Sequence, residues 1–210
     1  MTGSPTLLIG MLVAASLVPF ALVMMTSFVK MAVVLSIVRS ALGAQQVPPG
    51  SVITGLALVL SLAVMAPVAA QVGERLEQAW PQLATASPRE LLQSAQSVAE
   101  PLHAYLQAQA HPKNLQVFSR LLPGQQAEGS SSWRVLVPAF VISQLEEAFR
   151  MGFVIYLPFL VLDMLIGSIL LSLGMHMLSP ATVSLPFKLL LFVFADGWSL
   201  IGASLLGGNG

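Results

Sequence analysis

The sequence predicts an all-α membrane protein, with four long apolar helices arranged as two helical hairpins and a small polar helical segment between them. Of the 210 residues, 56% are hydrophobic and only 9% are charged, whereas soluble domains carry about 25% charged residues. The charges are also concentrated, because 13 of the 18 lie between Glu74 and Arg150. The uncharged runs 1–29, 40–73 and 164–187 are each long enough to cross a hydrocarbon core, which takes about 20 helical residues.

Hydropathy places the four apolar helices near residues 6–29, 51–72, 152–173 and 186–206. The last helix is expected to end in the Gly-Gly-Asn-Gly tail, which cannot continue a helix. No Lys or Arg precedes the first apolar stretch, so we expect no cleaved signal peptide. The short first connection carries Lys30 and Arg39, and positive charge in short loops stays cytoplasmic. This orientation places the N-terminus and the polar segment outside.

The polar segment is expected to be helical, with one flexible loop. Ser87-Pro88-Arg89-Glu90 reads as a capping box with proline at the first helical position. Pro101 is predicted to kink or end the helix near Glu100, and residues 123–132 form a loop by composition. The apolar positions that follow the capping box at helical spacing are Leu91, Ala95, Val98, Leu102 and Leu106.

A helical pattern resumes at Pro138 and runs without a break into the third apolar stretch, so we expect one long rod there. Its outer part carries Glu146 four residues before Arg150, as in an ordinary amphipathic helix. The predicted domains are an N-terminal apolar hairpin over residues 1–73, a polar segment over 74–137 and a C-terminal apolar hairpin over 138–210.

Composition and motifs exclude several classes of function. The nine basic and nine acidic residues cancel, so no basic surface is available for a nucleic acid. The chain has no cysteine, which excludes thiol chemistry. Its histidines, His103, His111 and His176, do not have a metal-ligand spacing, and no hydrolase or nucleotide motif occurs. We therefore expect no enzyme activity, no cofactor and no metal site.

Three charged residues lie within the apolar helices and are expected to face other protein. Asp163, Lys188 and Asp196 would each be costly in lipid, so they mark interior or subunit-facing surfaces; snorkelling to the membrane interface is the alternative for Lys188. If the last two helices are joined over residues 174–185, Asp163 and Lys188 differ in depth by about 12 Å. This mismatch predicts that they pair between neighbouring subunits, in an obligate oligomer.

Two other features of the C-terminal hairpin suggest contacts. Small residues recur every four positions at Ala195, Ser199, Ala203 and Gly207, a pattern that permits close helix packing in membranes. The stretch 174–186 contains a glycine and two prolines that break the helix, and broken backbone in an apolar layer must be buried by protein or line water. Its methionines either fill irregular gaps in a core or form an adaptable surface.

Several strings together resemble the FliP/SctR family, a component of the type III secretion export gate. The first half carries MTSFVK at 25–30 and LSIVRSALGAQQVPP at 35–49. The second half carries PAFVISQL at 138–145, GFVIYLPFL at 152–160, SLPFKLLLFV at 184–193 and DGW at 196–198. The resemblance spans nearly the whole chain, apart from residues 74–134.

The resemblance implies a pore-forming subunit of the export apparatus in the bacterial inner membrane, raised towards the periplasm within a helical hetero-oligomeric assembly. Several copies would assemble with two smaller export-gate membrane subunits, next to the larger export-gate protein and the secretion basal body. Unfolded secreted proteins would pass through the pore, and lipid would contact the complex. The family members are not enzymes.

The family's methionine-rich loop closes the pore as a gasket and maps onto Met175, His176 and Met177, with histidine at the central position. Many relatives have an acidic residue where this chain has Gln144, so an ion pair between subunits is not expected there. Flagellar members often begin with a cleavable leader, and its absence here favours a virulence or symbiosis system. The alternatives from other classes are a stand-alone small-solute transporter or channel, whose expected internal repeat is not apparent, and, more distantly, an intramembrane hydrolase.

Overall fold

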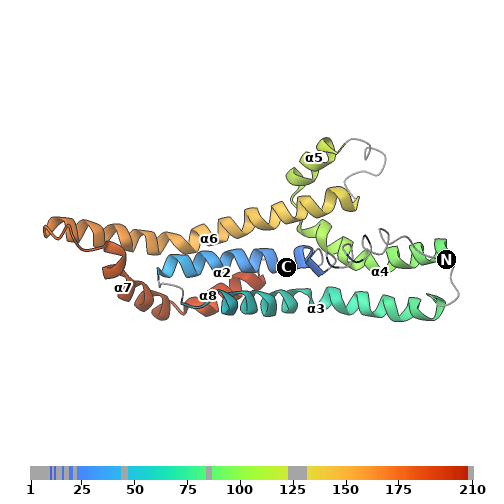
Figure 1. The fold of residues 1–210 in the computed structure, drawn as a ribbon, viewed down its shortest axis with the longest axis horizontal. Helices are drawn as coiled ribbons and strands as arrows, with labels where there is room; N and C mark the ends of the chain where they lie inside the picture. Colours follow the sequence, from blue (N-terminus) through green and yellow to red (C-terminus); the bar gives the residue numbers. More distant parts are fainter. Residues whose placement is uncertain are drawn as a thin grey trace. The chain divides into compact units, whose positions relative to one another are not determined.

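The computed structural model describes residues 23–43, 47–83, 87–122 and 132–207, with a few isolated positions between residues 10 and 20. These residues form helices and turns without a strand, which confirms the all-α prediction for the described part of the chain. The helices are α2 (Phe28–Leu42), α3 (Gly50–Leu83), α4 (Pro88–Gln109), α5 (Pro112–Leu121), α6 (Trp133–Ser172), α7 (Pro180–Phe194) and α8 (Gly197–Gly207) (Figure 1).

The arrangement of four apolar helices needs correction. Half of the first expected helix, 6–29, lies outside the described residues, as does nearly all of the expected loop at 123–132. The short first connection is instead the helix α2, which includes both Lys30 and Arg39. The expected last helix, 186–206, is wrong, because the chain forms two helices there, α7 and α8, at 61° to each other.

Among the described residues, two helices are long and apolar enough to cross a membrane, α3 and α6, and the bent pair of α7 and α8 would be a third if it is one span. The prediction of one continuous rod is confirmed, since α6 runs unbroken for 40 residues. At 1.5 Å per residue it is about 60 Å long, twice the hydrocarbon thickness of about 30 Å. Part of α6 therefore extends beyond any single apolar layer.

By its contacts the chain divides into two compact units. The first comprises Met1–Val29 and Met65–Gln144, and the second comprises Lys30–Val64 and Leu145–Gly210. In the first unit, a core of Leu106 and Ala110 from α4 and its C-cap packs on Leu136 and Phe140 of α6. This core anchors α4 to the N-terminal part of α6.

A buried hydroxyl joins the turn between α4 and α5 to α6 within the same unit. The Ser143 side chain accepts hydrogen bonds from the backbone N–H of His111 at 2.8 Å and from the Asn114 amide at 2.9 Å. It donates its own proton to the Ala139 carbonyl at 2.8 Å. The hydrogen-bonding capacity of this buried group is thus fully used, as burial of a polar atom requires.

The start of α4 confirms the predicted capping box. The Ser87 side chain accepts from the Glu90 backbone N–H, and the Glu90 carboxylate accepts from the Ser87 backbone N–H at 2.6 Å. The prediction for Pro101 is wrong in part, because α4 continues past it to Gln109. Pro101 is buried, so packing outweighs the loss of one backbone hydrogen bond.

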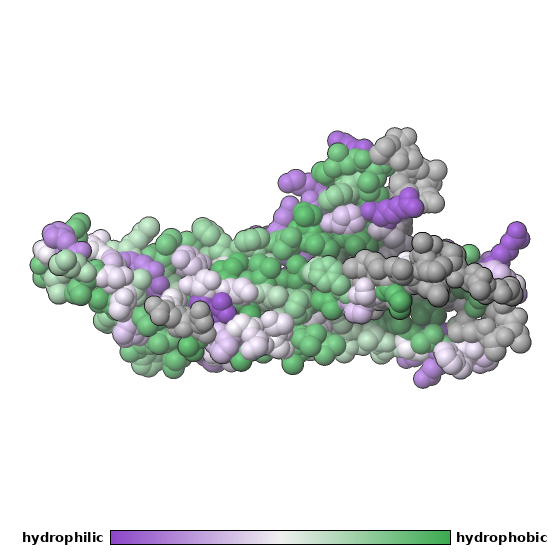
Figure 2. Space-filling model, in the orientation of Figure 1, coloured by the Kyte–Doolittle hydropathy of each residue, from purple (hydrophilic) through white to green (hydrophobic). Residues whose placement is uncertain are grey.

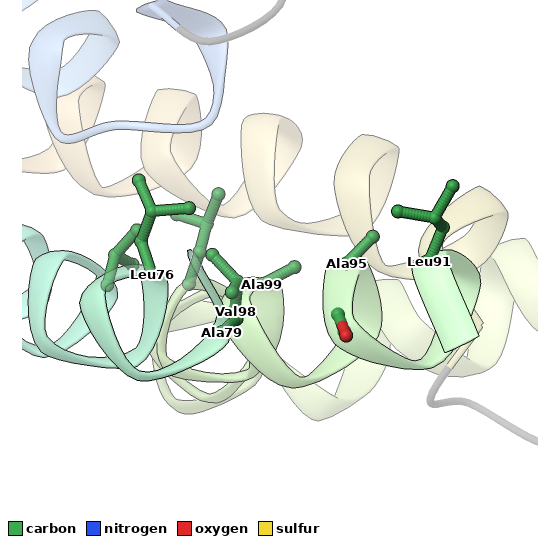
Figure 3. Close-up of a pocket in the computed structure, with 9 residues that line it drawn as sticks. Leu76, Ala79, Leu91, Ala95, Val98 and Ala99 are labelled. Atoms are coloured by element: carbon green, nitrogen blue, oxygen red, sulfur yellow. The ribbon is translucent and has the colours of Figure 1, made fainter. Parts of the chain in front are cut away.

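The apolar face predicted for α4 faces α3 within the first unit. Leu91, Ala95 and Val98 of α4 line a shallow groove of about 540 Å³ together with Leu76 and Ala79 of α3. Figure 3 shows these side chains along the two neighbouring helices. The last predicted position, Leu106, is fully buried in the core described above.

In the second unit α2 lies along α6 (Figure 1). The two helices approach most closely at Gly152, where a Cβ atom would overlap the end of the Ile37 side chain and lie 3.1 Å from Ile37 Cβ. The same pair of helices is joined by an ion pair between Lys30 Nζ and Glu147 Oε2 at 3.1 Å, with the Lys30 side chain fully buried. Glycine at position 152 permits this close packing.

Candidate functional site

The turn between α6 and α7 is built by a glycine that ends α6. Gly174 has a φ of 71°, a conformation that favours glycine. The Met175 N–H donates to the Leu170 carbonyl at 2.9 Å, and the Gly174 N–H donates to the Leu171 carbonyl at 3.1 Å. These two hydrogen bonds form a Schellman motif, which ends the helix and fixes the direction in which the chain leaves it.

The three predicted gasket residues lie together on this turn. Met177 is fully exposed at 101%, Met175 is 43% exposed, and His176 is also exposed. The predicted break in the helix is confirmed, but its extent is wrong: α7 begins at Pro180, so Pro186 lies within a helix. Ser179 and Pro180 provide the start, because proline suits the first position of a helix.

Below the turn, α6 and α7 are joined by a charge pair. Lys188 Nζ lies 2.6 Å from Asp163 Oδ2, and the Ser184 hydroxyl donates to Asp163 Oδ1. Lys188 and Ser184 are buried, and the Asp163 side chain is 28% exposed. Ser184 and Lys188 are four residues apart and therefore share the face of α7 that meets α6.

The expectation that Asp163 and Lys188 pair between subunits is therefore wrong. It depended on a helix start at Pro186, which would place the two charges at different depths. In the structure α6 ends at Ser172 and α7 begins at Pro180, so Asp163 lies nine residues before one end and Lys188 eight residues after the other. The two charges are level, and one hairpin supplies both.

The Lys188 ammonium also lies beside the C-terminal end of α2. A Cβ atom on Gly43, the residue after α2, would be 3.6 Å from Lys188 Nζ. The C-terminal end of a helix carries a partial negative charge and favours a nearby cation. The charge pair therefore lies where three helices of the second unit approach one another.

Asp196 lies at a different kind of position from the one expected. It is exposed and has a φ of 48°, between the end of α7 and the start of α8, rather than within an apolar helix. The next residue, Gly197, is buried, and a Cβ atom there would overlap the Phe192 ring. This close approach accounts for the break between the two helices.

The predicted stripe of small residues is exposed in the chain and is interrupted by the same break. Ala195 precedes the break, and the other three members, Ser199, Ala203 and Gly207, lie on α8. The buried face of α8 consists instead of Gly197, Ile201 and Leu205. This face was not predicted from the sequence, although its spacing of four residues is a helical signal.

The burial of two polar side chains was also not predicted from the sequence. Lys30 pairs with Glu147, and the available signal was a single charge within the otherwise uncharged stretch 23–38. Gln144 is fully buried, and neither its amide nitrogen nor its amide oxygen has a hydrogen-bond partner among the described residues. Such a group destabilises a fold until a partner or a water molecule satisfies it.

The long apolar helices α3 and α6 and the pair of α7 and α8 expose an extensive apolar surface. Only 17% of the most apolar window of α6 and 22% of that of α3 is buried within the chain. Figure 2 shows hydrophobic residues along much of the visible face of α6. The largest exposed side chains of α6, α7 and α8 include Phe149, Phe153, Leu165, Phe187, Phe194 and Trp198. Soluble monomers rarely expose such contiguous apolar surface, which needs lipid or protein to cover it.

Comparison with known proteins identifies the family. The profile of the FliP family matches residues 11–205. The chain belongs to the FliP family. This confirms the resemblance found in the sequence.

Individual relatives include proteins of both virulence and flagellar systems. The chain is 45% identical to the Salmonella typhimurium "Virulence protein YscR", over 97% of this chain and 96% of that protein. It is 44% identical to the Yersinia pestis "Yop proteins translocation protein R", over 95% and 94% of the two chains. It is 40% identical to the Caulobacter vibrioides "Flagellar biosynthetic protein FliP", over 95% of this chain and 74% of that protein.

Proposed function

We propose that this chain is a core pore-forming subunit of a type III secretion export gate, which passes unfolded proteins across the bacterial inner membrane. The observation that carries the proposal is the 44% identity, over 95% of this chain, with a protein named for the translocation of Yop proteins. The identities of 44% and 45% with the Yersinia and Salmonella proteins exceed the 40% with the Caulobacter flagellar protein. The names of the Salmonella and Yersinia relatives support a virulence or symbiosis system as the setting in this proposal.

In this proposal several copies assemble with two other export-gate membrane subunits, against the larger export-gate protein and the basal body. The apolar surface of α6, α7 and α8 supports an assembly, because lipid cannot cover a helix of about 60 Å over its whole length. The exposed small residues of α8 offer a surface for close helix contact. The apolar hairpins at 1–73 and 138–210 would pack in the assembly, raised towards the periplasm, and the polar segment at 74–137 would lie outside.

The gate itself is the turn at Met175, His176 and Met177. Methionine side chains are unbranched and adaptable, so a ring of them can close on itself and also conform to a passing chain. Their exposure in the single chain supports this role, since a side chain that seals a pore cannot be packed into its own subunit. Asp163 and Lys188 hold α6 and α7 together beneath the turn and position it.

The assembly is tested by co-expression of the chain with the neighbouring export-gate genes, followed by native mass spectrometry. We expect a defined hetero-oligomer with several copies of this chain. A well-folded monomer that is unchanged by the added partners would contradict the proposal.

The gate is tested with the double variant Met175→Ala/Met177→Ala. We expect increased ion leakage across the membrane with assembly intact, because the shorter side chains leave the pore open. The matched control is Met164→Ala, which truncates an exposed methionine of α6 outside the turn. Unchanged conductance in the double variant, or equal leakage in the control, would refute the gasket role.

A further inference from the structure

The turn between α6 and α7 carries three consecutive side chains whose donor atoms share one chemical property. Met175 and Met177 each offer a thioether sulfur, and His176 between them offers an imidazole nitrogen. All three side chains are exposed, and Met177 is exposed completely. Thioether sulfur is a soft ligand that selects Cu(I), and imidazole also binds copper.

We propose that Met175, His176 and Met177 form a binding site for a soft monovalent cation, Cu(I) or its analogue Ag(I). The proposal concerns the turn of a single chain and does not depend on the gasket role. Nothing in the described residues gathers three or more His, Cys, Asp or Glu side chains in a way that could hold a metal ion. The ligand set of this proposal consists of the two methionine sulfurs and the imidazole between them.

The backbone holds the three ligands close together. Consecutive Cα atoms are 3.8 Å apart, so the three side chains start within about 7.6 Å of one another. Hydrogen bonds from the Met175 N–H to Leu170, from the His176 N–H to Gly174 and from the Leu178 N–H to Met175 fix the turn. Each methionine has three rotatable bonds beyond this fixed backbone and can bring its sulfur to a shared ion.

The electrostatics of the turn select the class of cation. Magnesium and calcium require carboxylate or carbonyl oxygens, and the turn carries no acidic residue. The charged residues nearest in sequence are Asp163 and Lys188, which pair with each other beneath the turn. A neutral set of two sulfurs and one nitrogen therefore favours a soft ion of low charge over a hard divalent ion.

The test is a titration of the full chain in detergent with silver nitrate, in a chloride-free buffer, with methionine methyl groups labelled with carbon-13. We expect the methyl signals of Met175 and Met177 to shift with a single affinity, at one Ag(I) per chain. The variant Met175→Leu/Met177→Leu keeps the apolar volume and removes both sulfurs, and its affinity should fall at least tenfold. His176→Ala should also weaken binding, whereas His176→Met should retain it because a third thioether replaces the imidazole.

The control is Met164→Leu, which removes one exposed sulfur of α6 and should leave the affinity unchanged. Added Mg²⁺ should shift none of the methyl signals. The proposal is overturned if the double leucine variant binds Ag(I) as tightly as the parent chain. It is also overturned if the signal of Met164 shifts in parallel with those of the turn, because exposed thioethers would then be binding silver without a site.

Discussion

Replacing Asp163 should destabilise the hairpin of α6 and α7 more than replacing Lys188, its partner in the charge pair. In Asp163→Asn the ammonium of Lys188 loses its carboxylate, and the lysine side chain is only 5% exposed. Breaking a buried pair in this way costs about 3–5 kcal/mol. In Lys188→Met the Asp163 carboxylate is 28% exposed and keeps the Ser184 hydroxyl, so water and one hydrogen bond offset part of the loss. We expect a cost of about 1–3 kcal/mol for this variant.

The double variant Asp163→Asn/Lys188→Met measures the interaction energy between the two side chains, apart from their contacts with other residues. It leaves neither charge unpaired, so its stability should exceed that of Asp163→Asn alone, with a coupling energy of at least about 1 kcal/mol. The measurement is reversible unfolding in detergent, followed by tryptophan fluorescence. Trp198 is a suitable reporter because its ring packs edge-on against Phe192 of α7, with centroids 5.2 Å apart.

Two results would refute this reasoning. If the two single variants lost equal amounts of stability, the solvent exposure of the remaining charged side chain would not determine the loss. Strictly additive losses in the double variant would show that the two side chains do not interact within the chain.

Three further outcomes follow from other contacts. Gly152→Ala should destabilise the packing of α2 on α6 by about 1–3 kcal/mol, because the added methyl group would clash with Ile37. Gly167→Ala in the same helix should be neutral or stabilising, since the nearest side-chain atoms would lie 3.8 Å from the new Cβ atom. Thermal unfolding of both variants tests this difference. Ser143→Ala should cost about 1–3 kcal/mol and speed amide exchange in α5, because the buried Asn114 amide and the half-buried His111 N–H lose this acceptor. The backbone and side-chain hydrogen bonds of Ser87 hold the pKa of the Glu90 carboxyl below its ordinary value of 4.5. The contribution of Glu90 to stability is therefore present above pH 4.5 and is lost as the pH falls through the folded pKa. Amide exchange in α4 should become faster over this pH range, and Glu90→Gln should abolish the pH dependence.

The sequence predicted the features that depend on neighbouring residues. The capping box at Ser87 and Glu90 is defined by a spacing of three residues, and the end of α6 by one glycine. The long α6 followed from an unbroken helical pattern from Pro138 onward. Such signals are local, so they can be read without knowledge of the rest of the fold.

The predictions that proved wrong concern features that depend on residues far apart in the sequence. Pro186 is an ordinary signal for a helix boundary, yet α7 includes it because Ser184 and Lys188, on either side, must meet Asp163 on α6. Lys30 was taken as a loop charge because its partner, Glu147, is far away in the sequence. The candidate gate was located through the resemblance to the family, but its neighbouring charge pair required the structure.

The pairing of Lys30 with Glu147 has a consequence for the synthesis of the chain. The lysine is fully buried in the finished fold, and its acidic partner is added 117 residues later. At about 5–20 residues per second, a ribosome takes about 6–23 s to reach Glu147 after Lys30 has been translated. During that interval α2 has no α6 to pack against, and its cationic side chain must stay hydrated or be held by an insertion factor. The first helices of this protein therefore reach their final positions only after most of the chain has been made.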